Sequence, residues 1–189
     1  MKIKELLIKN RSVRRFDASR RISEEELREL VELARYCASG RNLQPLKYRV
    51  VSTPGECDAV FPHLKWAGYY SDWDGPEEGE RPVAYLVQCL DTDIAGDCLC
   101  DDGLQLEAIT LGATEKGIGG CIIKAFNPAG VGEALGIPSR YKPRYVLALG
   151  YPAEEVRLVE MDERDPEGHR YYRDADGTHC VPKRPTLLL

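Results

Sequence analysis

Two arginines and a serine lie close together near the start of the chain, in the stretch Arg-Ser-Val-Arg at residues 11–14. In extended backbone, residues two apart point to the same side, which brings Ser12 and Arg14 to one face. Guanidinium forks and a hydroxyl suit a phosphate group, because charge-assisted hydrogen bonds contribute about 1.5–3 kcal/mol each. The alternative is a solvated basic turn paired with Asp17 or Glu24, and residue types alone favour that simpler interpretation.

A second polar segment, residues 38–45, carries hydrogen-bonding groups without charge. Ser39, Asn42 and Gln44 have the donors and acceptors needed to read the edge of a planar polar ring. The alternative is a loop that ends a helix, with Gly40 as the residue just beyond the last turn.

The cysteines and histidines do not predict a metal site. Seven cysteines is an odd number, the three histidines are far apart, and no H-E-x-x-H motif is present. Structural zinc needs closely spaced ligand pairs, and the sequence has no C-x-x-C. We therefore expect no metal, and thiols that are mostly buried as small apolar groups.

Two glycine-containing stretches fail as nucleotide-binding motifs. Residues 112–117 have P-loop spacing, but Ile118 stands where the lysine must be. Residues 130–135 lack the third glycine of a dinucleotide fingerprint at the required position, and they follow a proline that opens a helix. Neither stretch predicts a phosphate-binding loop.

The composition excludes several classes of protein. The chain has 189 residues, of which 43% are hydrophobic, and 31 acidic against 26 basic side chains leave a net charge of −5. This balance argues against a nucleic-acid partner, because duplex binding relies on neutralising phosphates. No apolar run is long enough to span a membrane, and the charged start does not resemble a signal peptide. We expect a cytoplasmic protein that does not bind membranes.

Helices and strands are predicted along most of the chain. Apolar spacing predicts helices over residues 2–9, from a capping box at Ser23 to about Cys37, over about 94–116, and from Pro128 to Gly136. Apolar runs predict strands at 48–52, 83–90, 118–123 and 145–150. Because the two kinds of element do not alternate strictly, an α+β fold is favoured, as one domain spanning 1–189.

Two segments differ in amino-acid composition from these predicted helices and strands. Residues 66–81 form an acidic, aromatic loop, whose aromatic side chains either cover a binding site or anchor the loop to the core. Residues 151–189 are polar and punctuated by prolines, and Asp176-Gly177 predicts a hairpin turn. We expect 151–189 to form an arm that packs on its own domain or on a second copy.

Taken in order, the segments resemble the nitroreductase family of FMN-dependent NAD(P)H oxidoreductases. Each of the matching segments has low specificity by itself, but the ordered set is specific to the family and covers most of the chain. The blocks that carry the resemblance are residues 11–16, 38–45, 81–87, 107–121, 148–152 and 181–185.

The resemblance implies a homodimeric α+β fold, with a central, mostly antiparallel sheet flanked by helices, an extended C-terminal arm, and FMN at the subunit interface. It assigns Arg11, Ser12 and Arg14 to the FMN phosphate and ribityl chain, and adds Lys183 and Arg184 at the phosphate. Ala38, Ser39 and Asn42 would approach the flavin from the partner subunit. Ile122, Ile123, Lys124 and Ala125 would lie along the isoalloxazine, with the Lys124 backbone N–H near the flavin N5.

The chain departs from the family pattern at several positions. Asn10 stands where many members have a second arginine, so Arg15 is a candidate for the missing phosphate contact. Ala38 replaces a common proline, and Leu46 replaces a common aromatic residue. The usual polar flavin ligand before the central strand has no counterpart that we can assign in residues 66–81.

The resemblance implies an enzyme in which FMN, not a side chain, carries the chemistry. Electrons would pass in ping-pong order from NADH or NADPH, through bound FMN, to a nitroaromatic, a quinone or a similar small acceptor. The alternative from another class is a flavin carrier or sensor without NAD(P)H reductase activity.

Overall fold

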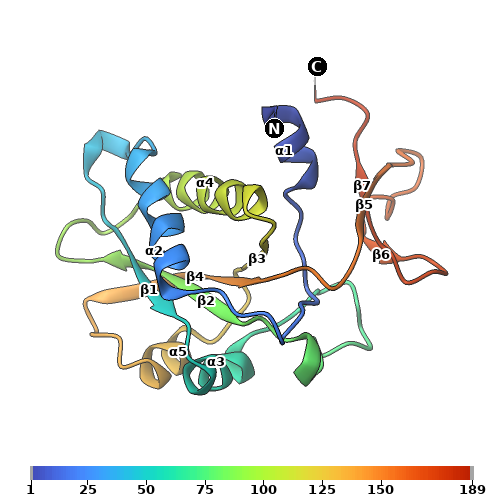
Figure 1. The fold of residues 1–189 in the computed structure, drawn as a ribbon. Helices are drawn as coiled ribbons and strands as arrows, with labels where there is room; N and C mark the ends of the chain where they lie inside the picture. The colour runs from blue at the N-terminus through green and yellow to red at the C-terminus, as the bar shows by residue number, and fades with distance from the viewer. Residues whose placement is uncertain (1, 188–189) are drawn as a thin grey trace.

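The centre of the molecule is a four-stranded antiparallel sheet (Figure 1). The structure is a computed structural model, and it describes residues 2–187. The strands are β1 (Leu46–Val51), β2 (Ala84–Asp91), β3 (Gly119–Ile123) and β4 (Tyr141–Gly150), in the order β1-β2-β4-β3. The predicted strands are confirmed, and β4 begins four residues earlier than the apolar run suggested.

The two inner strands, β2 and β4, carry the most apolar sequence. Every residue of β2 is buried, as a strand covered on both faces requires. In the register of this pair Leu86 lies opposite Leu147 and Val87 opposite Val146. Because side chains alternate along a strand, the first pair faces one layer of helices and the second pair the other.

Helices cover both faces of the sheet (Figure 1). α2 (Glu24–Leu33) and α4 (Asp101–Glu115) pack on one face, and α3 (Pro54–Val60) and α5 (Pro128–Ala134) on the other. Leu30 and Ile109 are fully buried against Leu147, and Val131 is fully buried in the cluster that contains Val146. The predicted α+β class is therefore confirmed.

Local sequence explains where most of the helices begin and end. The Ser23 side chain accepts a hydrogen bond from the backbone N–H of Glu26, whose carboxylate returns to the Ser23 N–H, so the predicted capping box is confirmed. Asn127 caps α5 at Pro128. Past its end, Gly136 has a φ of +59°, a conformation that glycine adopts without strain.

The predicted start of the longest helix is wrong. The apolar spacing suggested about Ile94, whereas α4 begins at Asp101. The intervening chain turns at Asp91–Ala95 and again at Cys98, and Leu99 has a φ of +53°, which no right-handed helix allows. Residues 94–100 therefore form turns rather than the first part of the predicted helix.

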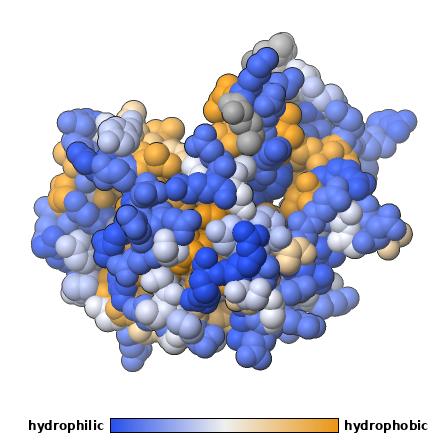
Figure 2. Space-filling model, in the orientation of Figure 1, coloured by the Kyte–Doolittle hydropathy of each residue, from blue (hydrophilic) through white to orange (hydrophobic). Residues whose placement is uncertain are grey.

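The first helix, α1 (Ile3–Lys9), has no buried residue. Ile3, Leu7 and Ile8 are exposed, and Figure 2 shows apolar patches among hydrophilic surface in the region of α1. The helix is attached through the Asn10 side chain, which donates to Thr110 Oγ1 of α4 at 2.9 Å. An apolar helix face left in solvent is typical of a surface that another chain covers.

The C-terminal arm folds into a small sheet of its own, in the order β5-β7-β6. β5 (Val156–Glu160) is parallel to β7 (His179–Lys183), and β6 (Tyr172–Arg173) is antiparallel to it. The predicted turn is confirmed: Gly177, with a φ of +81°, donates to the carbonyl of Asp174 at 3.0 Å. Within this one chain the arm lies beside the N-terminal segment (Figure 1), and its packing on a second copy remains a prediction.

Five of the seven cysteines are buried, as predicted, and all seven are free thiols. Among residues 2–187, no group of three or more His, Cys, Asp or Glu side chains is arranged to hold a metal ion. In the same part of the chain, no helix combines the length and the apolar composition needed to cross a bilayer.

Candidate functional site

The arginine-serine segment runs along the outer edge of the sheet. Ser12 forms a parallel bridge with Gly120 of β3, and the Val13 N–H donates to the Gly120 carbonyl at 3.0 Å. The close approach depends on small residues, since a Cβ on Gly119 would lie 2.9 Å from Val13 Cγ2. The segment of residues 11–14 therefore lies beside the start of β3, the strand that leads to residues 122–125.

Beyond this bridge the edge of β3 is open. Backbone groups alternate in direction along a strand, so Ile122 of β3 directs its N–H and carbonyl to the same edge as Gly120, and Lys124 follows directly after the strand. Ile123 instead pairs with Val146 of β4. Ile122, Lys124 and Ala125 are exposed, so the chain beyond the Ser12 bridge is accessible to solvent.

Arg11 is partly buried between α1 and α4. Its Nη2 donates to the Leu7 carbonyl at 2.7 Å, and its buried Nε has no hydrogen-bond partner among residues 2–187. Burial lowers the pKa of Arg11, and the nearby Glu107 carboxylate opposes that shift. A partly desolvated guanidinium with an unused donor is able to accept an anionic ligand.

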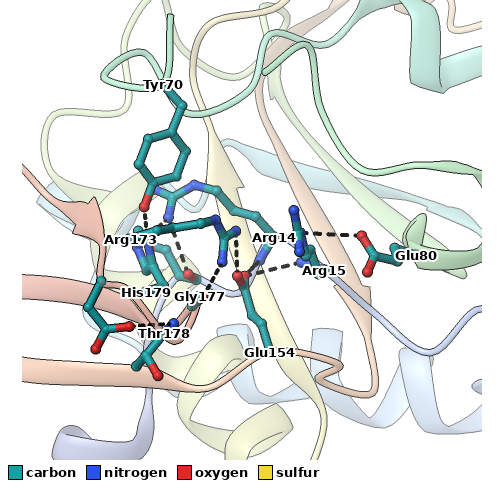
Figure 3. A network of polar contacts seen from close by, with 11 residues as sticks. Arg14, Arg15, Tyr70, Glu80, Glu154, Arg173, Gly177, Thr178 and His179 are labelled. Carbon is teal, nitrogen blue, oxygen red and sulfur yellow. Dashed lines mark hydrogen bonds and ion pairs between the residues drawn. The ribbon is translucent and has the colours of Figure 1, made fainter. Parts of the chain in front are cut away.

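Arg14 points the other way, into the C-terminal arm (Figure 3). Its Nη1 lies 2.8 Å from His179 Nε2 and 3.4 Å from the Ser12 carbonyl, and its guanidinium stacks over the Tyr171 ring at 4.6 Å. Arg14 is only 9% exposed. The predicted solvated basic turn is therefore wrong for Arg14, whose guanidinium is packed within the fold.

Glu154 links the same segment to the start of the arm. Its carboxylate accepts the backbone N–H groups of Arg14, at 2.5 Å, and Arg15, at 3.1 Å. Its second oxygen accepts from Arg173 Nη2 of β6 at 2.7 Å, an ion pair that is largely buried (Figure 3). The backbone around Arg14 is thus fixed by a charge that lies 140 residues away in the sequence.

The two basic residues predicted at the end of the arm are exposed. Lys183 is the last residue of β7, and it shares the strand face of His179 because residues four apart point the same way. Arg184 follows it and lies 3.8 Å from Glu163. The β7 face that contacts Arg14 thus continues outward to Lys183.

The loop of residues 38–45 is anchored at the start of α4. The Asp101 carboxylate, 1% exposed as a residue, accepts the Ser39 hydroxyl at 2.6 Å and the Gly40 N–H at 2.9 Å. Asn42 is exposed, and its side-chain oxygen accepts from Gln44 Nε2 at 3.0 Å. The loop conformation includes positive φ at Arg41, Asn42 and Gln44, and anchoring at Asp101 compensates for that strain.

Replacing Asp101 by alanine is expected to lower the free energy of unfolding by about 2–3 kcal/mol, because it removes two charge-assisted hydrogen bonds. Urea unfolding measures the change, with Asp58→Ala on the exposed side of α3 as the control. Equal stability of the two variants would contradict the anchoring role of Asp101.

Within one chain, the structure does not bring all the predicted segments together. Asp101 holds the 38–45 loop at the first turn of α4, whereas Asn10 is bound to Thr110, nine residues further along the helix. At a rise of 1.5 Å per residue, these attachment points are about 14 Å apart. Ala38, Ser39 and Asn42 therefore lie away from Arg11–Arg14 of the same chain.

The aromatic loop is anchored rather than free. Trp66 is buried in the core, with the Trp73 ring 6.5 Å away, which favours the anchoring interpretation for these two residues. Tyr70 reaches the arm, where its hydroxyl contacts His179 Nδ1. A cavity of about 400 Å³ opens between loop and arm, and a lid role for this loop remains a prediction.

Sequence reasoning missed His179 and Glu154. His179 lies two residues beyond the predicted turn at Asp176-Gly177, and Glu154 is one of many acidic residues in the arm. Both act through contacts with the N-terminal segment, 165 and 140 residues away. Nothing in the local sequence pattern signals such contacts.

The sequence that builds this site matches a known protein family. The pattern of the Nitroreductase family matches residues 7–74 and 101–151, which together make up more than half of the chain. The chain belongs to the nitroreductase family. The resemblance predicted from the ordered motifs is confirmed, as is the predicted enzyme class, an oxidoreductase of nitroreductase type.

Solved structures agree with the family's fold. A nitroreductase family protein from Clostridium novyi NT is 25% identical, with a TM-score of 0.67, over 80% of this chain and 87% of that one. An FMN-dependent nitroreductase from Clostridium difficile R20291 is 19% identical, with a TM-score of 0.68, over 91% of this chain and 99% of that one.

An NADPH:FMN oxidoreductase from Vibrio harveyi, solved in complex with NAD⁺, is 22% identical, with a TM-score of 0.61. That likeness covers 80% of this chain and 69% of the other. No curated protein matches the chain significantly. The likeness to these three solved structures confirms the predicted nitroreductase-like fold.

Proposed function

We propose that this nitroreductase-family protein binds FMN between two copies of the chain. In this proposal it passes electrons in ping-pong order from NADH or NADPH to a small acceptor such as a nitroaromatic or a quinone. The observation that carries the proposal is the pairing of Ser12–Val13 with Gly120, because it sets phosphate-binding side chains beside an open strand edge. The solved relatives named for FMN and NADPH support the choice of cofactor and donor.

The residues present fit an anionic, flat cofactor. Arg11 has an unused buried donor, Ser12 is exposed, and Arg14 is held in a defined orientation. In this proposal these three side chains hold the phosphate and ribityl chain, and Lys183 and Arg184 add positive charge at the phosphate. Planar guanidinium forks are well suited to phosphate oxygens.

Residues 122–125 would lie along the flavin ring. The outward backbone N–H of Lys124 then serves as a donor near N5, and exposed Ile122 provides an apolar contact. When bound, FMN supplies hydride transfer at N5. The chain's own contribution is a fixed donor where negative charge develops, together with exclusion of water from one face of the ring.

A second copy completes the site in this proposal. The 38–45 loop lies about 14 Å from the arginine segment of its own chain, measured along α4, so Ala38, Ser39 and Asn42 would reach the flavin held by the partner. The exposed apolar face of α1 is the kind of surface that such a dimer covers. A cytoplasmic location is consistent with this role and remains a prediction.

The function is tested by mixing purified protein anaerobically with NADH and, separately, with NADPH. We expect a yellow dimer that releases FMN on denaturation and loses its flavin absorbance with at least one nicotinamide. Adding a nitroaromatic or a quinone should restore the absorbance, and parallel double-reciprocal plots would establish the ping-pong order. Colourless protein that cannot be loaded with FMN contradicts the proposal, while loaded protein that no nicotinamide bleaches favours the carrier or sensor.

A further inference from the structure

His179 is a buried titratable side chain that contacts Arg14 of the proposed cofactor site. It lies at the start of β7 and is 1% exposed. Both of its ring nitrogens have partners from distant segments: Nε2 lies 2.8 Å from Arg14 Nη1, and Nδ1 contacts the hydroxyl of Tyr70 (Figure 3). One imidazole thus joins the arm, the N-terminal segment and the aromatic loop.

The partners decide which nitrogen carries the proton. A guanidinium has donors and no acceptor, so Nε2 must accept the hydrogen bond from Arg14. The ring proton is then on Nδ1, where it is donated to the Tyr70 oxygen. His179 is therefore a neutral acceptor, and protonation of Nε2 would break its contact with Arg14.

The surroundings keep the imidazole neutral. Burial is the main cause that lowers the pKa of His179 to about 4, and the positive charges of Arg14 and Arg173 act in the same direction. The Glu154 carboxylate opposes them. The Tyr171 ring, whose centroid is 5.3 Å from that of the imidazole, packs beside His179.

Arg14 is restrained on several sides, but His179 is the side chain that accepts from its guanidinium. Tyr171 stacks on the guanidinium plane, and Glu154 holds only the backbone N–H of Arg14. The hydrogen bonds from Nη1 to His179 and to the Ser12 carbonyl set the rotation of the fork. The opposite edge of the fork, with Nε and Nη2, then has a fixed direction.

We propose that His179 is a positioning residue, which holds the Arg14 guanidinium in the orientation that meets the phosphate of FMN. The inference rests on the proposed function, since it takes Arg14 as a phosphate ligand. It adds a specific role for the arm: β7 contributes an acceptor that orients a binding arginine 165 residues earlier in the chain.

Two variants of the full chain separate this role from a purely structural one. His179→Gln keeps an acceptor oxygen near the position of Nε2, whereas His179→Leu keeps the bulk and removes the acceptor. Apoprotein of each variant is titrated with FMN and with riboflavin, which lacks the phosphate. We expect His179→Leu to weaken FMN binding about 10-fold and riboflavin binding less than about 2-fold, and His179→Gln to stay near wild type for both.

The flavin titrations distinguish failure of the positioning role of His179 from failure of the proposed function. Wild-type protein that binds neither flavin overturns the proposed function and this inference with it. If wild type binds FMN but His179→Leu binds it equally well, or loses FMN and riboflavin in equal measure, only the positioning role is overturned. In an Arg14→Ala background, His179→Leu should cause no further loss of FMN affinity, because coupled residues are non-additive.

A measurement on wild-type protein covers the case in which His179→Leu does not fold. Imidazole ¹⁵N NMR at neutral pH should show His179 protonated on Nδ1 and unprotonated on Nε2. A proton on Nε2 would overturn the inference, since that nitrogen could not then accept from Arg14.

Discussion

Replacing Arg11 and Arg14 together by alanine is expected to weaken FMN binding by roughly 100-fold or more. Each guanidinium is proposed to make charge-assisted hydrogen bonds to the phosphate worth about 1.5–3 kcal/mol, and every 1.4 kcal/mol is a factor of ten in affinity. Quenching of FMN fluorescence on binding to apoprotein gives the dissociation constant. Riboflavin should discriminate far less between wild type and variant, because it carries no phosphate.

The control for charge is Arg28→Ala combined with Arg164→Ala, which removes two exposed guanidiniums that pair with Glu24 and Asp162. This variant should bind FMN like wild type. Arg14 is buried and Arg11 is partly exposed, so the single variant Arg11→Ala should disturb the fold less than any variant that removes Arg14. FMN affinity equal to that of wild type in the folded double variant would refute the phosphate assignment.

Acidification from about pH 6.5 to about pH 4 is expected to lower the free energy of unfolding through His179 by up to about 3 kcal/mol. The imidazole takes up a proton with an ordinary pKa of 6.5 when the chain is unfolded, and with a pKa of about 4 when it is folded. Between these values the unfolded state binds more protons, so falling pH favours unfolding. Above about pH 6.5 both states are neutral at this site and the effect vanishes.

Urea unfolding at a series of pH values measures this dependence. Carboxylates also contribute below about pH 5, so the quantity of interest is the difference between wild type and His179→Gln, which lacks the titrating group. His169→Gln, which removes an exposed imidazole from the same arm, is the control and should keep the wild-type dependence. Identical pH profiles for wild type and His179→Gln would show that His179 is not held neutral by the fold.

Much of the secondary structure could be predicted, because its causes are local. The capping box at Ser23 and the glycine at Gly136 each act within one turn of backbone, and the apolar run of β2 reports burial on both faces. The start of α4 was mispredicted because the spacing of apolar residues does not report the backbone conformation at a single residue. Helical spacing of apolar residues says nothing about Leu99, whose left-handed conformation interrupts the pattern.

The candidate site, like the secondary structure, has features that the sequence predicted and features that it did not. Residue types near Arg11–Arg14 left two interpretations open, a phosphate-binding group and a solvated basic turn, whereas the ordered motifs predicted the nitroreductase family, which the family match confirms. The direction in which each arginine points was not predictable. Arg11 faces α1, and Arg14 faces the arm.

The sequence by itself determined the strands of the central sheet, the family, and the chemical character of the segments proposed to hold FMN. All of these depend on side chains that are close together in the chain or on motifs that recur in order. Tertiary structure alone decided that Ser12 runs beside Gly120, that Glu154 fixes the backbone of Arg14, and that His179 accepts from its guanidinium. Such contacts join residues more than 100 positions apart, and their strength comes from burial, which only the folded chain supplies.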